Sequence, residues 1–300
     1  MIYDVIIIGA GPAGLTASIY CARAGKSVLV VEKETLGGKI TETPVVYNIP
    51  GFSEISGAEF GANLTEQAQN QGVEILIDEI TSIEFNNDDT LKVIGDFDTY
   101  CGKTCIIATG TKNRGLGLPH EEEFTGSNIS YCVTCDGPLY VGKDVAVVGG
   151  GNSAVTYALE LAGYANRIYV IQNLAYLTAE KSLCDKLYKK DNVEIITNSI
   201  VTEYLTTENG LFKGIQTVNT ETKEDRYFIL DGVFLAIGLI PDNDRFRKTG
   251  SVAINEKGFI QGTMPPIFAC GDCTDTINKQ VVIAAASGAE TALKVLRYLH

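Results

Sequence analysis

Residues 2–14 read IYDVIIIGAGPAG, and this stretch decides the fold. Its first seven residues form the short apolar run of a buried strand, and the glycines after them have the Gly-x-Gly-x-x-Gly spacing of a dinucleotide-binding turn. A helical pattern continues to about Ala24, and a second strand, 27–31, ends in Glu32. A helix N-terminus can hold a pyrophosphate, and an acid about 20 residues on can hold ribose hydroxyls. The stretch therefore predicts a Rossmann-type unit, with a ligand-free Gly-rich turn as the alternative.

A second copy of this unit begins at Val145. A buried strand, 145–148, leads to Gly149-Gly150-Gly151-Asn152-Ser153-Ala154, a helix to about Gly163 and a strand over 168–171. Two breaks in composition, at 112–118 and 238–243, have the glycine and proline content of crossovers between domains. We therefore predict an α/β fold of two Rossmann-like nucleotide-binding domains, each of the three-layer ββα type, with the second inserted into the first: residues 1–113 with 241–300, and residues 114–240.

The remaining pattern fills in both domains. In the first we expect a helix over 57–71, strands at 73–77, 80–86, 91–94 and 104–108, a return through 259–272, and a final helix over 281–299. In the second we expect strands at 193–197, 200–205, 212–218 and 227–237.

Composition narrows the class of protein. The chain has 300 residues, 45% of them hydrophobic, which is enough for the cores of two domains. Its net charge of −13 argues against nucleic acid and anionic membranes as partners. The N-terminus lacks the basic stretch of a signal peptide, and no apolar run approaches the ~20 residues of a membrane span. We therefore expect a cytoplasmic protein in which most of the eight cysteines stay reduced.

The chemistry centres on Cys132-Val133-Thr134-Cys135-Asp136. Two cysteines at this spacing can close a small disulfide, and a thiolate of lowered pKa can attack another protein's disulfide. Half of a zinc site and two buried side chains are the alternatives. Zinc could also involve Cys101 and Cys105, but that site would silence the dithiol, so we expect no metal.

The other cysteines and the two histidines suggest packing or surface positions. Cys270 and Cys273 share the same spacing, but their surroundings favour small buried residues, and Cys21 and Cys184 fall in helical patterns. His120 precedes three glutamates and His300 ends the chain, so we expect both at the surface.

Seven ordered motifs resemble those of the low-molecular-weight thioredoxin reductases, flavoproteins with a redox-active Cys-x-x-Cys in an inserted domain. They are Gly9–Gly14, Gly37-Gly38, Asn48-Ile49-Pro50-Gly51, Ala108-Thr109-Gly110, Cys132–Gly137, Ala236-Ile237-Gly238 and Gly271-Asp272-Cys273. The resemblance implies that the first domain binds FAD, with Gln280 and Val281 beside the isoalloxazine ring and Gly271 and Asp272 at the ribityl phosphate. The other implied FAD contacts are Gly9, Gly11, Pro12, Ala13, Gly14, Glu32, Gly37, Gly38, Asn48, Ala108, Thr109 and Gly110.

The resemblance also implies the roles of the dithiol. Cys135 would face the flavin, Cys132 would attack thioredoxin, and the protein would form a homodimer whose inserted domain rotates on the two crossovers. With both histidines at the surface, Asp136 is the remaining candidate for shuttling the proton. Capping a helix is its alternative role.

One motif departs from the family. Members that use NADPH carry His-Arg-Arg-x-x-x-Arg after the second glycine turn, where this chain has Ile171-Gln172-Asn173-Leu174-Ala175-Tyr176-Leu177. A 2′-phosphate would find no cation there, and Gln172 offers no carboxylate for the ribose of NADH. The pattern resembles the ferredoxin-dependent flavin thioredoxin reductases. An orthodox NADPH enzyme using a cation such as Lys181, and a flavin redox sensor without turnover, are the alternatives.

The charge leaves a question about partners. Thioredoxins and ferredoxins are commonly acidic, so the bulk charge of this chain would slow their encounter. A local basic patch is therefore expected. Lys181, Lys186, Lys189, Lys190, Lys112 and Arg114 are the candidates, with an ordinary solvated surface as the alternative.

Overall fold

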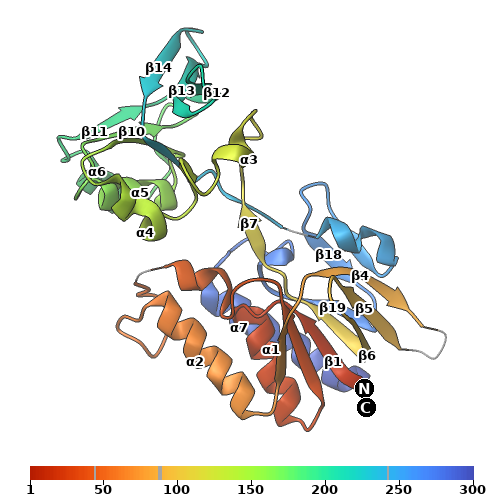
Figure 1. Ribbon diagram of the computed structural model, residues 1–300. Helices are drawn as coiled ribbons and strands as arrows, with labels where there is room; N and C mark the ends of the chain where they lie inside the picture. The colour runs from red at the N-terminus through yellow and green to blue at the C-terminus, as the bar shows by residue number, and fades with distance from the viewer. Residues whose placement is uncertain (44, 87–89, 242) are drawn as a thin grey trace. The chain divides into compact units, whose positions relative to one another are not determined.

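The computed structural model describes residues 1–43, 45–86, 90–241 and 243–300. The chain divides into two compact units, Met1–Lys112 with Ile240–His300 and Asn113–Leu239. Each unit contains a parallel sheet in which a glycine-rich turn joins the central strand to a helix (Figure 1). The predicted α/β class with two Rossmann-like units is confirmed.

Unit 1 is built on a seven-stranded sheet with β3, β2, β1, β6, β5 and β4 in that order and β19 beside β6. Strands β1, β2, β3, β6 and β19 are mutually parallel, and β4 and β5 add an antiparallel hairpin. The expected strand at 104–108 is longer and begins at Thr99. The strands are β1 (Ile2–Ile8), β2 (Val28–Glu32), β3 (Glu74–Ile77), β4 (Ile80–Phe85), β5 (Leu91–Gly95), β6 (Thr99–Ile107) and β19 (Ile267–Ala269).

Strand β1 shows how the sheet of unit 1 is covered on both faces. Val5 and Ile7 point into a core with helices α1 (Pro12–Arg23) and α7 (Val281–Tyr298). Ile6 and Ile8 point into a second core that includes Phe246. Residues 5–8 of β1, which are buried on both faces, must therefore all be apolar. The other elements of the unit are α2 (Gly57–Asn70), β17 (Val252–Ile254), β18 (Ile260–Thr263) and the 3-10 turns η1 (Gly38–Glu42), η3 (Asp244–Thr249) and η4 (Gly271–Cys273).

Unit 2 repeats the pattern with a five-stranded parallel sheet in the order β11, β10, β9, β15, β8 and a separate antiparallel sheet of β12, β13 and β14. Its strands are β8 (Ile129–Ser130), β9 (Asp144–Val148), β10 (Arg167–Ile171), β11 (Val193–Ile196), β12 (Ser199–Thr206), β13 (Phe212–Asn219), β14 (Asp225–Ile229) and β15 (Gly232–Leu235). Its helical elements are α3 (Glu121–Phe124), α4 (Val133–Asp136), η2 (Gly137–Tyr140), α5 (Asn152–Leu161) and α6 (Lys181–Leu187).

The single strand predicted over 227–237 is wrong. The chain forms two strands there, and they belong to different sheets: β14 is exposed except at Phe228, whereas β15 is buried on both faces. Leu230 and Asp231 separate them, with the Asp231 amide bonded to the Asp144 carbonyl.

The two crossovers pair with each other. Strands β7 (Thr111–Asn113) and β16 (Leu239–Pro241) form a two-stranded ladder, and the Arg114 amide donates to the Gly238 carbonyl. Asp242, inside the second predicted crossover, lies outside the described residues.

Candidate active site

Cys132, just after β8, forms a disulfide with Cys135, in the short helix α4. The sulfur atoms are 2.04 Å apart and the Cα atoms 5.3 Å apart. Cys132 is the N-cap of α4, and its Sγ accepts a hydrogen bond of 3.1 Å from the Cys135 amide. Val133, between the two cysteines, is fully buried in the core that also contains α5. The buried valine therefore fixes the turn, while Cys135 is exposed and Cys132 half-buried.

Ser130 ties the dithiol to Asp136. Its Oγ accepts a hydrogen bond of 3.0 Å from the Cys132 amide and donates one of 2.7 Å to Asp136 Oδ2. The Asp136 side chain makes no helix-capping hydrogen bond at η2, so the capping alternative finds no support. Sequence analysis missed Ser130, although a serine two residues before the first cysteine is within reach of both groups.

A second carboxylate lies behind the dithiol turn. Glu160, on α5, accepts a hydrogen bond from Thr134, and burial raises the pKa of Glu160. The Tyr164 hydroxyl occupies the space beside Gly137, where a Cβ atom would meet it. Within the described residues, that hydroxyl is the one buried side-chain polar atom without a hydrogen-bond partner. Nothing in the sequence pattern signalled either group.

The first glycine turn forms an open cradle. Gly9 has a φ of +108°, and a Cβ there would lie 2.4 Å from the Ala108 carbonyl oxygen; at Gly14 it would lie 2.0 Å from the Gly9 carbonyl oxygen. At Gly11 the nearest atom to such a Cβ is the Gly38 Cα, 4.0 Å away. Helix α1 starts at Pro12 without a side-chain cap. Packing thus fixes the two outer glycines, while the middle one leaves room beside free helix amides, which suits a pyrophosphate.

Several predicted cofactor residues lie around this cradle. Glu32 accepts hydrogen bonds from the Ala10 amide at 2.7 Å and the Glu34 amide at 3.0 Å. The Gly37 amide donates to the Ala10 carbonyl. Asn48 Nδ2 donates to Gln280 Oε1 at 3.0 Å, joining two predicted residues 232 positions apart. Val281 packs beside them, against the cluster of Val46, Ile49 and Ile55.

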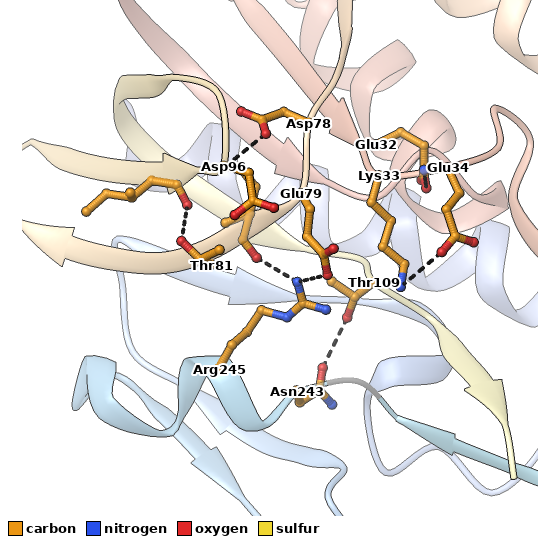
Figure 2. A network of polar contacts seen from close by, with 12 residues as sticks. Glu32, Lys33, Glu34, Asp78, Glu79, Thr81, Asp96, Thr109, Asn243 and Arg245 are labelled. Atoms are coloured by element: carbon orange, nitrogen blue, oxygen red, sulfur yellow. Dashed lines mark hydrogen bonds and ion pairs between the residues drawn. The ribbon is translucent and has the colours of Figure 1, made fainter. Parts of the chain in front are cut away.

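The far side of the cradle is held by Asn243, which sequence analysis missed. Its Oδ1 accepts a hydrogen bond from Thr109 Oγ1, a dashed line in Figure 2, and its Nδ2 donates to the Gly258 and Cys273 carbonyls. Nearby, Lys279 Nζ donates to the Asp272 carbonyl. Burial raises the pKa of the Asp272 carboxyl, and the Lys279 charge opposes that shift. Gly271 also belongs here, since its amide bonds Ser287 on α7.

The second glycine turn has a different interior. Gly149 has a φ of +129°, and a Cβ there would lie 2.4 Å from the Ala236 carbonyl oxygen, as at Gly9. Above Gly150, however, lies the buried side chain of Gln172, whose atoms would be 2.4–2.9 Å from an added Cβ. Gln172 Nε2 donates to the Tyr176 carbonyl, and the Thr178 amide donates to the Gly150 carbonyl.

Residues 171–180, all of them described, contain no cation. Lys181, the alternative source of one, pairs with Asp185 at 2.6 Å.

Among the described residues, the remaining cysteines and His120 do not form a second redox or metal centre. Cys270 and Cys273 are buried free thiols, and burial raises the pKa of Cys273 to about 11. Cys21 and Cys184 are also buried, and His120 pairs with Glu123 at the surface. Across the described ranges, no three His, Cys, Asp or Glu side chains gather as metal ligands. Among the same residues, no helix combines the length and hydropathy of a membrane span.

Comparison with known proteins identifies the family. Residues 3–288 match the family model described as pyridine nucleotide-disulphide oxidoreductase. The 34.2 kDa protein in the rubredoxin operon of Clostridium pasteurianum is 42% identical over 99% of this chain and 97% of its own length. Thioredoxin reductase of Bacillus subtilis is 35% identical over 100% and 95%. The crystal structure of Lactococcus lactis thioredoxin reductase superposes with a TM-score of 0.91 at 31% identity, covering 99% of both chains. The chain therefore belongs to the pyridine nucleotide-disulphide oxidoreductase family and is a thioredoxin reductase-like disulfide oxidoreductase.

Proposed function

We propose that this protein is an FAD-dependent thioredoxin reductase that takes its electrons from reduced ferredoxin. The first predicted domain (residues 1–113 and 241–300), which corresponds to unit 1, would bind FAD, and the second (114–240), which corresponds to unit 2, would carry the dithiol. The open cradle at Gly11 and the Asn48–Gln280 contact support the cofactor assignment. FAD supplies one property that the side chains lack, the ability to accept single electrons and pass on a pair.

The dithiol carries the electrons to the substrate. On reduction, the Cys132–Cys135 bond takes up two electrons and two protons and becomes two thiols, and Asp136, held by Ser130, would supply and remove the proton at the sulfur. The hydrogen bond from the Cys135 amide favours the thiolate of Cys132. That thiolate attacks the disulfide of thioredoxin to form a mixed disulfide, and Cys135 then displaces reduced thioredoxin.

The second glycine turn is the observation that favours ferredoxin over NADPH as the electron donor. Gln172 fills the space above Gly150, and residues 171–180 offer no cation for a 2′-phosphate. Ferredoxins near −400 mV and thioredoxin near −270 mV differ by about 130 mV, about 6 kcal/mol for two electrons. The clostridial relative is encoded in a rubredoxin operon, consistent with an iron-protein donor.

An anaerobic titration tests the proposal directly. The purified protein is mixed in turn with NADPH, NADH and photoreduced ferredoxin while the absorbance band of oxidised flavin is followed. We expect ferredoxin to bleach the band and both nicotinamides to leave it unchanged. Rapid stoichiometric bleaching by NADPH would restore the orthodox reductase.

A second arm addresses the redox-sensor alternative. After ferredoxin reduction, oxidised thioredoxin is added and its thiols are counted against time. Multiple turnovers support a reductase, whereas a single reduction of the protein's own dithiol supports a sensor.

A further inference from the structure

An open hollow of about 480 Å³ lies on unit 2, lined by Leu159, Lys186, Lys189 and Lys190. All three lysines are exposed, and within the described residues none of them is in an ion pair. Lys181, which begins the helix α6 that also carries Lys186, differs in being neutralised by Asp185. Three unneutralised cations around one apolar side chain stand out in a chain of net charge −13. We call this set the lysine hollow.

The lysine hollow shares helix α5 with the dithiol. Leu159 lines the hollow, and the next residue, Glu160, holds Thr134 of the dithiol turn. Consecutive residues of one helix therefore contact the hollow and the dithiol turn. A typical protein–protein interface covers about 800 Å² per partner, a disc of roughly 16 Å radius. A protein that brings a disulfide to Cys132 would therefore also cover the hollow.

The charge and apolar area of the hollow favour an acidic protein as the partner. Lysines can pair with exposed carboxylates, and Leu159 and the exposed ring of Tyr188 add apolar area between and beside them. Because the rest of the chain is acidic, this patch would orient an acidic protein that bulk charge otherwise repels. The electron donor must deliver to the flavin in unit 1, whereas the disulfide substrate must reach the dithiol in unit 2. The hollow beside the dithiol therefore suits the substrate.

We propose that the lysine hollow is the electrostatic docking site for the acidic face of the disulfide-bearing protein substrate. The proposal rests on the proposed thioredoxin reductase function and adds where the substrate is held. Two acids neighbour the hollow along the chain: Asp185, beside Lys186 and already paired with Lys181, and Asp191, beside Lys190. They limit the local charge but do not cancel it. The attraction should act mainly on the rate of association and weaken with salt.

The test compares two charge-matched double variants. Lys186→Glu with Lys189→Glu reverses the hollow. Lys92→Glu with Lys213→Glu makes the same change of net charge at exposed strand positions, on β5 of unit 1 and β13 of unit 2. Each protein, in its flavin-loaded form, is reduced with dithionite, freed of excess reductant and mixed anaerobically with an oxidised thioredoxin of net negative charge. The second-order rate of thiol appearance is measured at 20 and 500 mM salt, and circular dichroism checks the fold.

We expect the hollow variant to react at least fivefold more slowly than wild type at low salt, and the gap to close at high salt. The control pair should stay within twofold of wild type. All three should reduce 2-hydroxyethyl disulfide, a small uncharged substrate, at equal rates. Equal slowing of both variants, or no slowing of the hollow variant, overturns the docking site.

The two proposals fail in different ways. If wild type reduces the small disulfide but not thioredoxin, the partner and its docking site are wrong. If reduced wild type reduces neither, the reductase function itself is wrong and the docking proposal falls with it.

Discussion

The two glycine turns of this protein have nearly the same backbone and opposite interiors. Gly9 and Gly149 share a positive φ, and each lies too close to a carbonyl of a neighbouring strand end to carry a side chain. Around the first turn, Glu32 accepts a hydrogen bond from the Ala10 amide and the space at Gly11 stays open. Around the second, Gln172 lies directly over the turn.

This difference shows that a glycine motif indicates how a strand is joined to a helix and does not by itself indicate a bound ligand. The steric requirement at Gly9 and Gly149 is internal to each unit and would hold without any cofactor. We infer that ligand binding depends instead on the residue at the end of the second strand, Glu32 at the end of β2 and Gln172 just after β10. The predictions below test that division.

The largest effect is expected at the third position of the motif, which is Gly14 in the first turn and Ala154 in the second. A methyl group at Gly14 would lie 2.0 Å from the Gly9 carbonyl oxygen, whereas the Ala154 methyl is buried without conflict. Gly14→Ala should lower the free energy of unfolding by about 3 kcal/mol and release most of the flavin. Ala154→Gly should cost only about 1 kcal/mol. Urea unfolding and the flavin-to-protein absorbance ratio measure both; a Gly14→Ala protein with full flavin would contradict the packing argument.

A second effect should appear when Gln172 is changed to glutamate, the residue type that unit 1 has at Glu32. Gln172→Glu leaves the Tyr176 carbonyl facing a buried carboxylate in place of an amide donor, and should lower the free energy of unfolding by about 2.5 kcal/mol. It should not create NADH oxidation, because the side chain still lies over Gly150. Chemical denaturation and an NADH assay with thioredoxin check both parts. Gln172→Met, uncharged and of similar length, is the control, and measurable NADH turnover by Gln172→Glu would show that only the charge was missing.

Sequence analysis captured what depends on local pattern. Glycine spacing and strand hydropathy predicted the positions of both turns correctly, and Glu32 supported the first. These signals are local, because the residues that form each turn lie within about 25 positions of one another. It failed where a partner comes from elsewhere in the chain. Asn243 carries no local signal, since its role exists only when Thr109 and Cys273 are brought together. The strand predicted over 227–237 failed because two runs of similar hydropathy belong to different sheets.

The comparison extends to the residues after the edge strands β3 and β11 of the two sheets. In unit 1 this is Asp78, a buried carboxylate that accepts hydrogen bonds from Tyr100 and from the amides of residues 96–98; Figure 2 shows the one from Asp96. In unit 2 it is the uncharged pair Thr197 and Asn198. Burial alone would raise the pKa of Asp78, but these hydrogen bonds outweigh it and hold the pKa below its ordinary value.

Asp78→Asn should therefore lower stability in a pH-dependent way. A carboxyl whose pKa is depressed on folding stabilises above its unfolded pKa, near 3.9, and loses that contribution as the pH falls through the folded value. The variant should be about 2 kcal/mol less stable than wild type at pH 7 and pH 5, with the gap shrinking below about pH 4. Urea unfolding at pH 7, 5 and 3.5 measures this. Asn198→Ala, in unit 2, should show a pH-independent loss; a gap at Asp78 that widens in acid would reverse the sign argued here.

The smallest and most selective effect is expected at the middle glycines, Gly11 and Gly151. A Cβ at Gly11 would lie 4.0 Å from its nearest neighbour and one at Gly151 3.8 Å, so both alanine variants should fold with unchanged stability. Only the first turn is proposed to face a pyrophosphate. Gly11→Ala should therefore weaken FAD binding about tenfold, or about 1.4 kcal/mol, while Gly151→Ala leaves flavin content and ferredoxin-driven thioredoxin reduction unchanged.

Reconstitution of the flavin-stripped proteins with FAD, followed by fluorescence quenching, gives the two affinities. Gly11→Ala and Gly151→Ala are chemically identical substitutions that both backbones should tolerate equally. A difference in FAD affinity between the two variants therefore reports on the space above each turn and not on its backbone. If Gly151→Ala slowed turnover while Gly11→Ala did not weaken FAD binding, the assignment of the ligand-binding turn to unit 1 would be wrong.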